Sequence, residues 1–124
     1  NHGIYVLSYS DKNTLSDNFI SKNKYGIRIK GCHFNNVSKN IIINNDRGVY
    51  CCCGADYNEI YFNNFFENYE YNGIESSTLT NYWENNYWDD YNGSDMDDDG
   101  YGDTPYLIPL GNDLDSKPLI NPFE

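Results

Sequence analysis

The sequence predicts an all-β protein, a parallel β-helix of about four coils of 22–25 residues that closes with an irregular acidic cap. Two repeated patterns predict the coils, and an unusual run of carboxylates predicts the cap. Gly followed by Ile or Val recurs at residues 3, 26, 48 and 73, with spacings of 23, 22 and 25 residues. A repeat of this length, with short alternating runs and no helical period, is typical of β-solenoids.

A second marker keeps the same period. The pattern Asn–any–apolar, two residues, Asn–any–apolar begins at residues 13, 35 and 58, and a degraded copy begins at Thr80. Apolar residues alternate within each coil, which predicts three inward-facing pairs. These pairs are Ile4 and Val6, Ile27 and Ile29, and Val49 and Cys51. An antiparallel sandwich with evenly spaced strands is the alternative fold.

The second Asn of each repeat predicts a ladder of side chains. Equivalent residues of consecutive coils stack about 4.8 Å apart in a solenoid. An Asn amide both donates and accepts, so it can bond from coil to coil at a turn. The predicted ladder consists of Asn18, Asn40, Asn63 and Asn85.

Charge is concentrated in the last third of the chain. The net charge is −11; residues 1–88 carry nine acids and seven bases, whereas residues 89–124 carry ten acids and one base. No basic stripe is present to neutralise phosphates, which argues against a nucleic-acid partner. No apolar run approaches the 18 residues of a membrane span.

The segment "DMDDDGYGD" has the D-x-D-x-D-G spacing of a calcium loop. Asp95, Asp97 and Asp99 would supply carboxylate oxygens, Tyr101 its backbone carbonyl, and Asp103 a direct or water-mediated oxygen. Such hard oxygen ligands favour Ca²⁺ over softer metals. The sequence therefore predicts calcium as the cofactor, and a solvated acidic loop without an ion is the alternative.

The loop departs from an EF-hand at its twelfth position, which is Tyr106 instead of Glu. Further oxygens must then come from elsewhere, and the candidates are Asp89, Asp90, Asp113 and Asp115. The end of a β-helix exposes unpaired strand edges. We expect aromatic side chains near residues 83–91 to plug it and the ion to fold the final segment across it. Stacking of those aromatic side chains on sugar rings is the alternative.

The motif "N-x-I-x-x-N-x-I…G-I" resembles the right-handed parallel β-helix repeats of many secreted and cell-surface proteins. It is similar to the group named after the NosD periplasmic copper-binding proteins and to archaeal surface proteins with that repeat. The stretch "NNYWDDYNGSDMDDDGYGDTPYLIP", followed by "DSKPLINP", resembles the segment that ends such arrays. The resemblance implies coils over residues 1–88, a cap over residues 89–124, and an extracellular or cell-surface location.

The four cysteines predict one disulfide. Cys32 and Cys53 lie six and five residues after the Gly that opens their coils, so they should fall almost above one another. Copper is a weaker interpretation, because adjacent cysteines alternate sides in a strand and only two histidines are present. The triplets at Asn36 and Asn92 fit the N-glycosylation signal.

Catalysis is not expected, because the acids of the repeats share no register and no nucleophile–base pair is visible. The leading hypothesis is a structural or adhesive extracellular module, stabilised by Ca²⁺, whose open N-terminal end stacks on upstream coils or on another copy. End-to-end stacking would give filaments or a surface layer. Alternatives are a polysaccharide-processing fragment, a copper-handling protein, or a carbohydrate-binding module. The last would use a lateral patch of Tyr5, Arg28, Lys30 and Tyr50.

Overall fold

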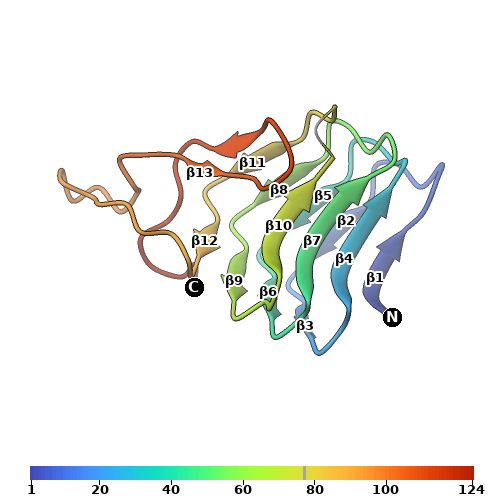
Figure 1. The fold of residues 1–124 in the computed structure, drawn as a ribbon, viewed down its shortest axis with the longest axis horizontal. Coiled ribbons are helices and arrows are strands. Elements are labelled where there is room, and N and C mark those ends of the chain that lie inside the picture. Colours follow the sequence, from blue (N-terminus) through green and yellow to red (C-terminus); the bar gives the residue numbers. More distant parts are fainter. Residues whose placement is uncertain (77) are drawn as a thin grey trace.

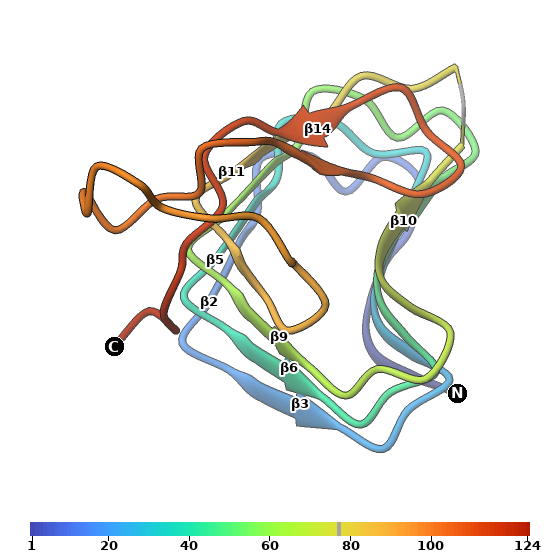
Figure 2. The same cartoon turned by 60° about the vertical axis from the view of Figure 1, so that its left-hand side comes forward.

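The computed structural model describes residues 1–76 and 78–124 and confirms the predicted parallel β-solenoid of about four turns. Each coil contributes one strand to each of three sheets, and the coils lie side by side along the long axis (Figure 1). Viewed closer to that axis, they superpose as a three-sided tube (Figure 2). Among the described residues there is no helix that could cross a membrane.

The strands fall into three sheets, A, B and C. Sheet A consists of β1 (His2–Val6), β4 (Tyr25–Lys30), β7 (Arg47–Cys52) and β10 (Tyr71–Glu75). Sheet B consists of β2 (Thr14–Ser16), β5 (Asn36–Ser38), β8 (Glu59–Tyr61), β11 (Tyr82–Glu84), β14 (Leu114–Asp115) and β13 (Tyr106–Leu107). Sheet C consists of β3 (Phe19–Ser21), β6 (Ile41–Ile43), β9 (Asn64–Phe66) and β12 (Tyr87–Trp88).

The core is built from columns of side chains that stack from coil to coil. Sheet A contributes the columns Ile4–Ile27–Val49–Gly73 and Val6–Ile29–Cys51–Glu75. Sheet B contributes Leu15–Val37–Ile60–Trp83, and sheet C contributes Ile20–Ile42–Phe65–Trp88. The inward pairs expected from alternation are confirmed, since Ile27, Ile29, Val49 and Cys51 are fully buried. Toward the C-terminal end the columns of sheets B and C therefore end in Trp, whereas those of sheet A end in Gly73 and Glu75.

The Gly residues that open the coils are required by close packing. A Cβ on Gly26 would lie 2.6 Å from the carbonyl oxygen of Gly48 and 3.2 Å from the side chain of Ile42. Such approaches leave no room for a side chain. In the fourth coil the equivalent residue is Asn72, because Tyr71 pairs with Arg47 and Gly73 with Val49.

Asparagine side chains form three ladders, one at each corner of the tube. The first is Asn13–Asn35–Asn58–Asn81, the second Asn18–Asn40–Asn63–Asn86, and the third Asn23–Asn45–Asn68. At each step the backbone N–H and the Nδ2–H of one Asn donate to Oδ1 of the next; Asn40, for example, lies 3.1 and 2.9 Å from Asn63 Oδ1. Every ladder runs in one direction, with its donors facing the C-terminal end.

The expected fourth member, Asn85, is wrong, because Asn63 donates to Asn86. The residue before each ladder Asn has a positive φ, namely Asp17, Lys39, Phe62 and Asn85 at 59°, 57°, 55° and 55°. Asn85 therefore occupies the turn position that precedes the ladder. The step from Asn63 to Asn86 is 23 residues, one more than the 22 that separate Asn63 from the expected Asn85.

The register predicts unequal effects of two neighbouring substitutions. Asn86→Ala removes the acceptor of two Asn63 donors inside the protein and should destabilise it by about 2–4 kcal/mol. Asn85→Gly keeps a residue that tolerates positive φ and should cost less than about 1 kcal/mol. Urea unfolding of both variants measures the difference. A larger loss of stability for Asn85→Gly than for Asn86→Ala would indicate that Asn85, and not Asn86, is the fourth member of the ladder.

Candidate cation site and C-terminal cap

Each Asn ladder ends on a carboxylate from the C-terminal third of the chain. The backbone N–H of Asn81 donates to Asp113 at 2.7 Å, and that of Asn86 donates to Asp115 at 2.9 Å. The third ladder passes through Asn72, whose Nδ2–H group donates to Asp89 and Asp90 at 2.8 and 2.9 Å. A carboxylate accepts but does not donate. It can therefore end a ladder without requiring another coil.

Asp115 is the most enclosed of these terminating groups. It is fully buried and accepts from the backbone N–H groups of Asn85 and Asn86, from Lys117 N–H, and from Trp88 Nε1 at 2.9 Å. Burial raises the pKa of Asp115, and the hydrogen bonds from Asn86 and Trp88 oppose that rise. Several donors around one carboxylate are the usual way to keep such a group buried.

Aromatic side chains close the core beneath the cap. Trp88 lies between Phe65 and Tyr106, with ring centroids 4.5 and 4.1 Å away and planes nearly parallel. Trp83 is also buried, and its Nε1–H donates to Glu75 at 3.0 Å. For the two Trp residues, these contacts match the expectation that aromatic side chains near residues 83–91 plug the core end. Both indoles reach an acceptor, as buried Trp requires.

Glu75 is a fully buried carboxyl group in the core column of Cys51. Its Oε2 accepts from Trp83 and Asn81, whereas Oε1 has no hydrogen-bond partner among the described residues. Burial, followed by a hydrogen bond with the Asp113 carboxylate, raises the pKa of Glu75 to about 8. The raised pKa of Glu75 thus depends in part on Asp113, a carboxylate of the cap. Sequence alternation places residue 75 inward, but no pattern indicated its partner.

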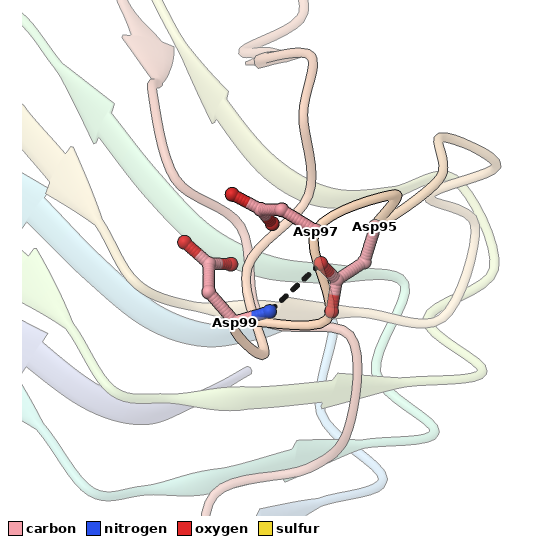
Figure 3. Close-up of side chains that lie close together, drawn as sticks. All are labelled: Asp95, Asp97 and Asp99. Carbon is pink, nitrogen blue, oxygen red and sulfur yellow. Dashed lines mark hydrogen bonds between the residues drawn. The ribbon is translucent and has the colours of Figure 1, made fainter.

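The acidic loop projects from the C-terminal end of the solenoid, and its carboxylates gather over one turn (Figures 2 and 3). Asp95, Asp97 and Asp99 each offer an oxygen, and these oxygens lie within 4.8 Å of one another. Asp95 accepts from the backbone N–H groups of Asp99 and Gly100 at 3.1 and 2.9 Å. Gly100 has a φ of 92°, which is the turn expected of it. The loop is thus ordered with three carboxylates side by side.

The carboxylates of this loop influence one another. A hydrogen bond with Asp95, followed by burial and the charge of Asp99, raises the pKa of Asp97. Burial acts against ionisation of Asp95, but hydrogen bonds from Gly100 and Asp99 outweigh it and lower its pKa. Like charges held this close repel unless a proton or a cation lies between them. The arrangement is therefore suited to a cation.

Backbone pairing connects the loop to the last coil. Ile120 N–H donates to Gly100 at 3.1 Å, and Gly102 N–H donates to Pro118 at 2.7 Å. Leu119 bridges both Tyr101 and Tyr87 of β12, and its N–H donates to Asn86. Ordering of the loop can therefore be transmitted to the C-terminal edge of the solenoid.

The other predicted oxygen ligands lie outside the cluster. Asp103 accepts from Met96 N–H at 2.8 Å within the same loop. The four candidate additional ligands accept hydrogen bonds from the last Asn of each ladder instead. They are Asp89, Asp90, Asp113 and Asp115. Their positions in the sequence therefore serve the capping of the last coil. The sequence did not reveal this role, because the ladder partners lie about 17–32 residues away.

The predicted disulfide is absent, and all four cysteines are free thiols. Lys30 pairs with Cys52, so Cys53 aligns with Gly31 and not with Cys32. Cys32 is buried and donates to Lys30 O at 3.1 Å, whereas Cys53 is exposed. Cys51 faces inward as expected.

The lateral patch does come together. The Arg28 guanidinium carbon lies 5.5, 4.9 and 5.5 Å from the ring centres of Tyr5, Tyr25 and Tyr50, and Lys30 follows on the same outer face of β4. Arg28 also donates to Cys52 Sγ at 3.7 Å, while its Nε has no partner. Tyr25 is the member of this patch that the sequence did not single out.

The two glycosylation triplets differ in accessibility. Asn92 is exposed, whereas Asn36 is half-buried and donates to the Tyr61 hydroxyl at 2.9 Å. Modification of Asn36 would break that bond, and modification of Asn92 would break none that involves its side chain. Asn92 is therefore the better acceptor site.

The family model described as periplasmic copper-binding protein (NosD) matches residues 1–93, and the chain belongs to that family. The match covers the four coils and ends at the start of the acidic loop. No curated protein and no solved structure matches the chain.

The donor set does not fit the copper of the family description. Copper favours imidazole and soft sulfur ligands. Among the described residues, the group of three or more ligating side chains is the set of carboxylates at residues 95, 97 and 99. The ring of His2 stacks on Tyr5 and Tyr25, and Cys51 is enclosed in the core. The clustered donors are hard oxygens, which suit Ca²⁺ or Mg²⁺.

The Glu75 pKa predicts a stability that falls as pH rises. The folded pKa of about 8 lies above the ordinary value of 4.5, so the stabilisation is complete below pH 4.5 and is lost as pH approaches 8. The slope is at most about 1.4 kcal/mol per pH unit from this group. Glu75→Gln keeps an acceptor for Trp83 and should be the more stable protein at pH 8. Urea unfolding between pH 5 and 8 tests this, and equal slopes in both proteins would contradict it.

Thiol reactivity tests the cysteine assignment. A thiol-specific disulfide reagent should label Cys53 rapidly in the native protein, and all four cysteines after unfolding without reductant. Cys53→Ser should abolish the fast reaction. Only two reactive thiols in the unfolded protein would show that a disulfide exists.

Proposed function

We propose that the chain is a non-catalytic structural or adhesive module that functions outside the cytoplasm, and that Ca²⁺ at Asp95, Asp97 and Asp99 stabilises its C-terminal cap. The observation that carries the proposal is the convergence of three carboxylate oxygens within 4.8 Å on a loop paired to the last coil. The family, described as periplasmic, supports a periplasmic or extracellular location. In such compartments millimolar Ca²⁺ suits sites of about 10⁻⁴–10⁻³ M.

The position of the carboxyl group with a strongly raised pKa favours a structural role. Glu75 has the strongly raised carboxyl pKa, yet it is fully buried beneath the cap. A general acid must reach its substrate. The polar groups of the last coil therefore support capping of the solenoid, while the N-terminal strands β1, β2 and β3 remain edge strands.

Assembly is proposed through the N-terminal end. The Oδ1 atoms of Asn13, Asn18 and Asn23 begin the ladders, and a preceding coil or a partner with N–H donors would extend them. End-to-end stacking of identical copies would place the carboxylate-terminated cap against these acceptors. Acceptor against acceptor is unfavourable, so another β-helix coil is the better partner than the capped end of a second copy.

A glycan-binding module is the second candidate. It is favoured by the three Tyr rings around the Arg28 guanidinium and by Lys30 on the same outer face of β4, which together suit an anionic sugar. Loss of binding on a glycan array after Tyr5→Ala or Tyr50→Ala would support it.

Calcium should raise the melting temperature. At 10 mM Ca²⁺ and the affinities above, binding contributes about 1.4–2.7 kcal/mol, or about 4–10 °C for a domain of this size. Chelator should reverse the shift. Asp97→Asn should melt higher than wild type in chelator, because it relieves repulsion, and should lose the response to Ca²⁺.

The matched control is Asp98→Asn, which removes a neighbouring carboxylate outside the cluster at a position of positive φ that Asn tolerates. This variant should keep the calcium response. A melting temperature of the wild-type protein that ignores both calcium and chelator would refute the proposed site.

A further inference from the structure

The outer face of sheet B carries a groove of about 540 Å³ near the C-terminal end of the solenoid. It lies over β8 and β11, away from the acidic loop and from the Arg28 patch on sheet A. The lining residues are Glu59, Tyr61, Phe62, Tyr82, Glu84 and Asn85. Two carboxylates and three aromatic rings therefore share one cavity, and no basic residue lines it.

The strand register places carboxylate and aromatic side chains next to each other, alternately along and across the two strands. Glu59 pairs with Tyr82, and Tyr61 pairs with Glu84, on adjacent parallel strands. Alternate residues of a strand point to the same face. Each carboxylate thus has an aromatic neighbour one coil away, and the two carboxylates occupy diagonal positions, which lie about 7–8 Å apart in a sheet.

Within the part of the chain that the structure describes, the carboxylates of this groove have no partner. Among the described residues, the salt bridge present joins Arg47 of β7 in sheet A to Glu70, and neither Glu59 nor Glu84 has a side-chain hydrogen bond. The turn beyond the groove is fixed, because Phe62 packs on Phe123 and the Asn85 side chain donates to Lys117 O. The groove is thus a supported surface that presents two unpaired negative charges.

Aromatic rings beside carboxylates are the combination that recognises organic cations. An ammonium or guanidinium group gains from the ring face and from the carboxylate together. A metal ion does not fit, because one ion needs oxygens that converge and these two carboxylates are diagonal. A neutral sugar could stack on Tyr82 but would leave both charges without a counterion, and an acidic sugar would be repelled.

We propose that this groove binds organic cations with two amino or guanidinium groups, one beside Glu59 and Tyr82 and the other beside Glu84 and Tyr61. Linear polyamines and the Lys or Arg side chains of an extended peptide both supply this chemistry. The proposal is independent of the calcium site and of the Arg28 patch.

The test is calorimetric titration of the 124-residue protein with spermidine and with a Lys-Gly-Lys-Gly-Lys peptide. Saturating Ca²⁺ is present in every titration, so that the acidic loop is occupied or screened and does not compete for the organic cation. Saturable binding is expected, weakened about three- to tenfold by Glu84→Gln and by Tyr82→Ala. Both residues are exposed, so neither variant should alter the melting temperature by more than a few degrees.

Matched controls are Asp17→Asn, an exposed carboxylate in a turn, and Tyr9→Ala, a ring that is 97% exposed. Both should bind spermidine and the peptide as the wild-type protein does. The tighter of the two ligands identifies the source of the cation. Binding that is equally weakened in Asp17→Asn, or a groove that takes neutral oligosaccharides and no cation, would overturn the proposal.

Discussion

The asparagine amide is the group on which this solenoid depends. At each corner one side chain donates to the next coil and accepts from the previous one, so each step is a pair of hydrogen bonds inside a buried column. The interaction has a direction, because donors always face the C-terminal end. It fixes the register of neighbouring coils, and it requires an acceptor where the array stops.

That requirement explains much of the acidity of residues 89–124. Asp113, Asp115 and the pair at residues 89 and 90 supply the terminal acceptors, while Trp83 and Trp88 cover the core between them. The carboxylates of residues 95, 97 and 99 are a separate cluster, half-buried at Asp95 and exposed at the other two, that receives no Asn ladder. The acidic third of the chain thus contains two groups of carboxylates: one ends the Asn ladders, and the other is the cluster for which we propose a cation.

The repeated architecture could be predicted from sequence because its signals are periodic. Gly26 and Gly48, the inward Ile and Val residues, and Asn18, Asn40 and Asn63 recur at spacings of 22 or 23 residues and occupy the predicted positions. The calcium-type spacing likewise brought Asp95, Asp97 and Asp99 together. The errors begin where the period changes: the last ladder step is one residue longer than expected, so the ladder ends on Asn86 and not on residue 85, whereas the step from Gly48 is one residue shorter than expected, so Asn72 stands where Gly73 was expected.

Other features could not be read from local patterns. The partnership of Glu75 with Asp113, and of Asp115 with Trp88, joins residues far apart in a segment that has no repeat. The cysteine pairing failed for a geometric reason, since a shift of one residue places Cys53 beside Gly31. The groove over β8 and β11 is formed by side chains of two coils. Its residues could be identified only once the structure gave the pairing of these two strands.

The ladder can be observed directly by NMR through couplings across hydrogen bonds. In uniformly ¹³C,¹⁵N-labelled protein, we expect the backbone ¹⁵N of Asn63 to couple to the side-chain carbonyl carbon of Asn86, and that of Asn86 to the carboxyl carbon of Asp115. These two couplings would establish both the coil register and its carboxylate end. A coupling from Asn63 to the side chain of Asn85, or none from Asn86 to Asp115, would contradict the account.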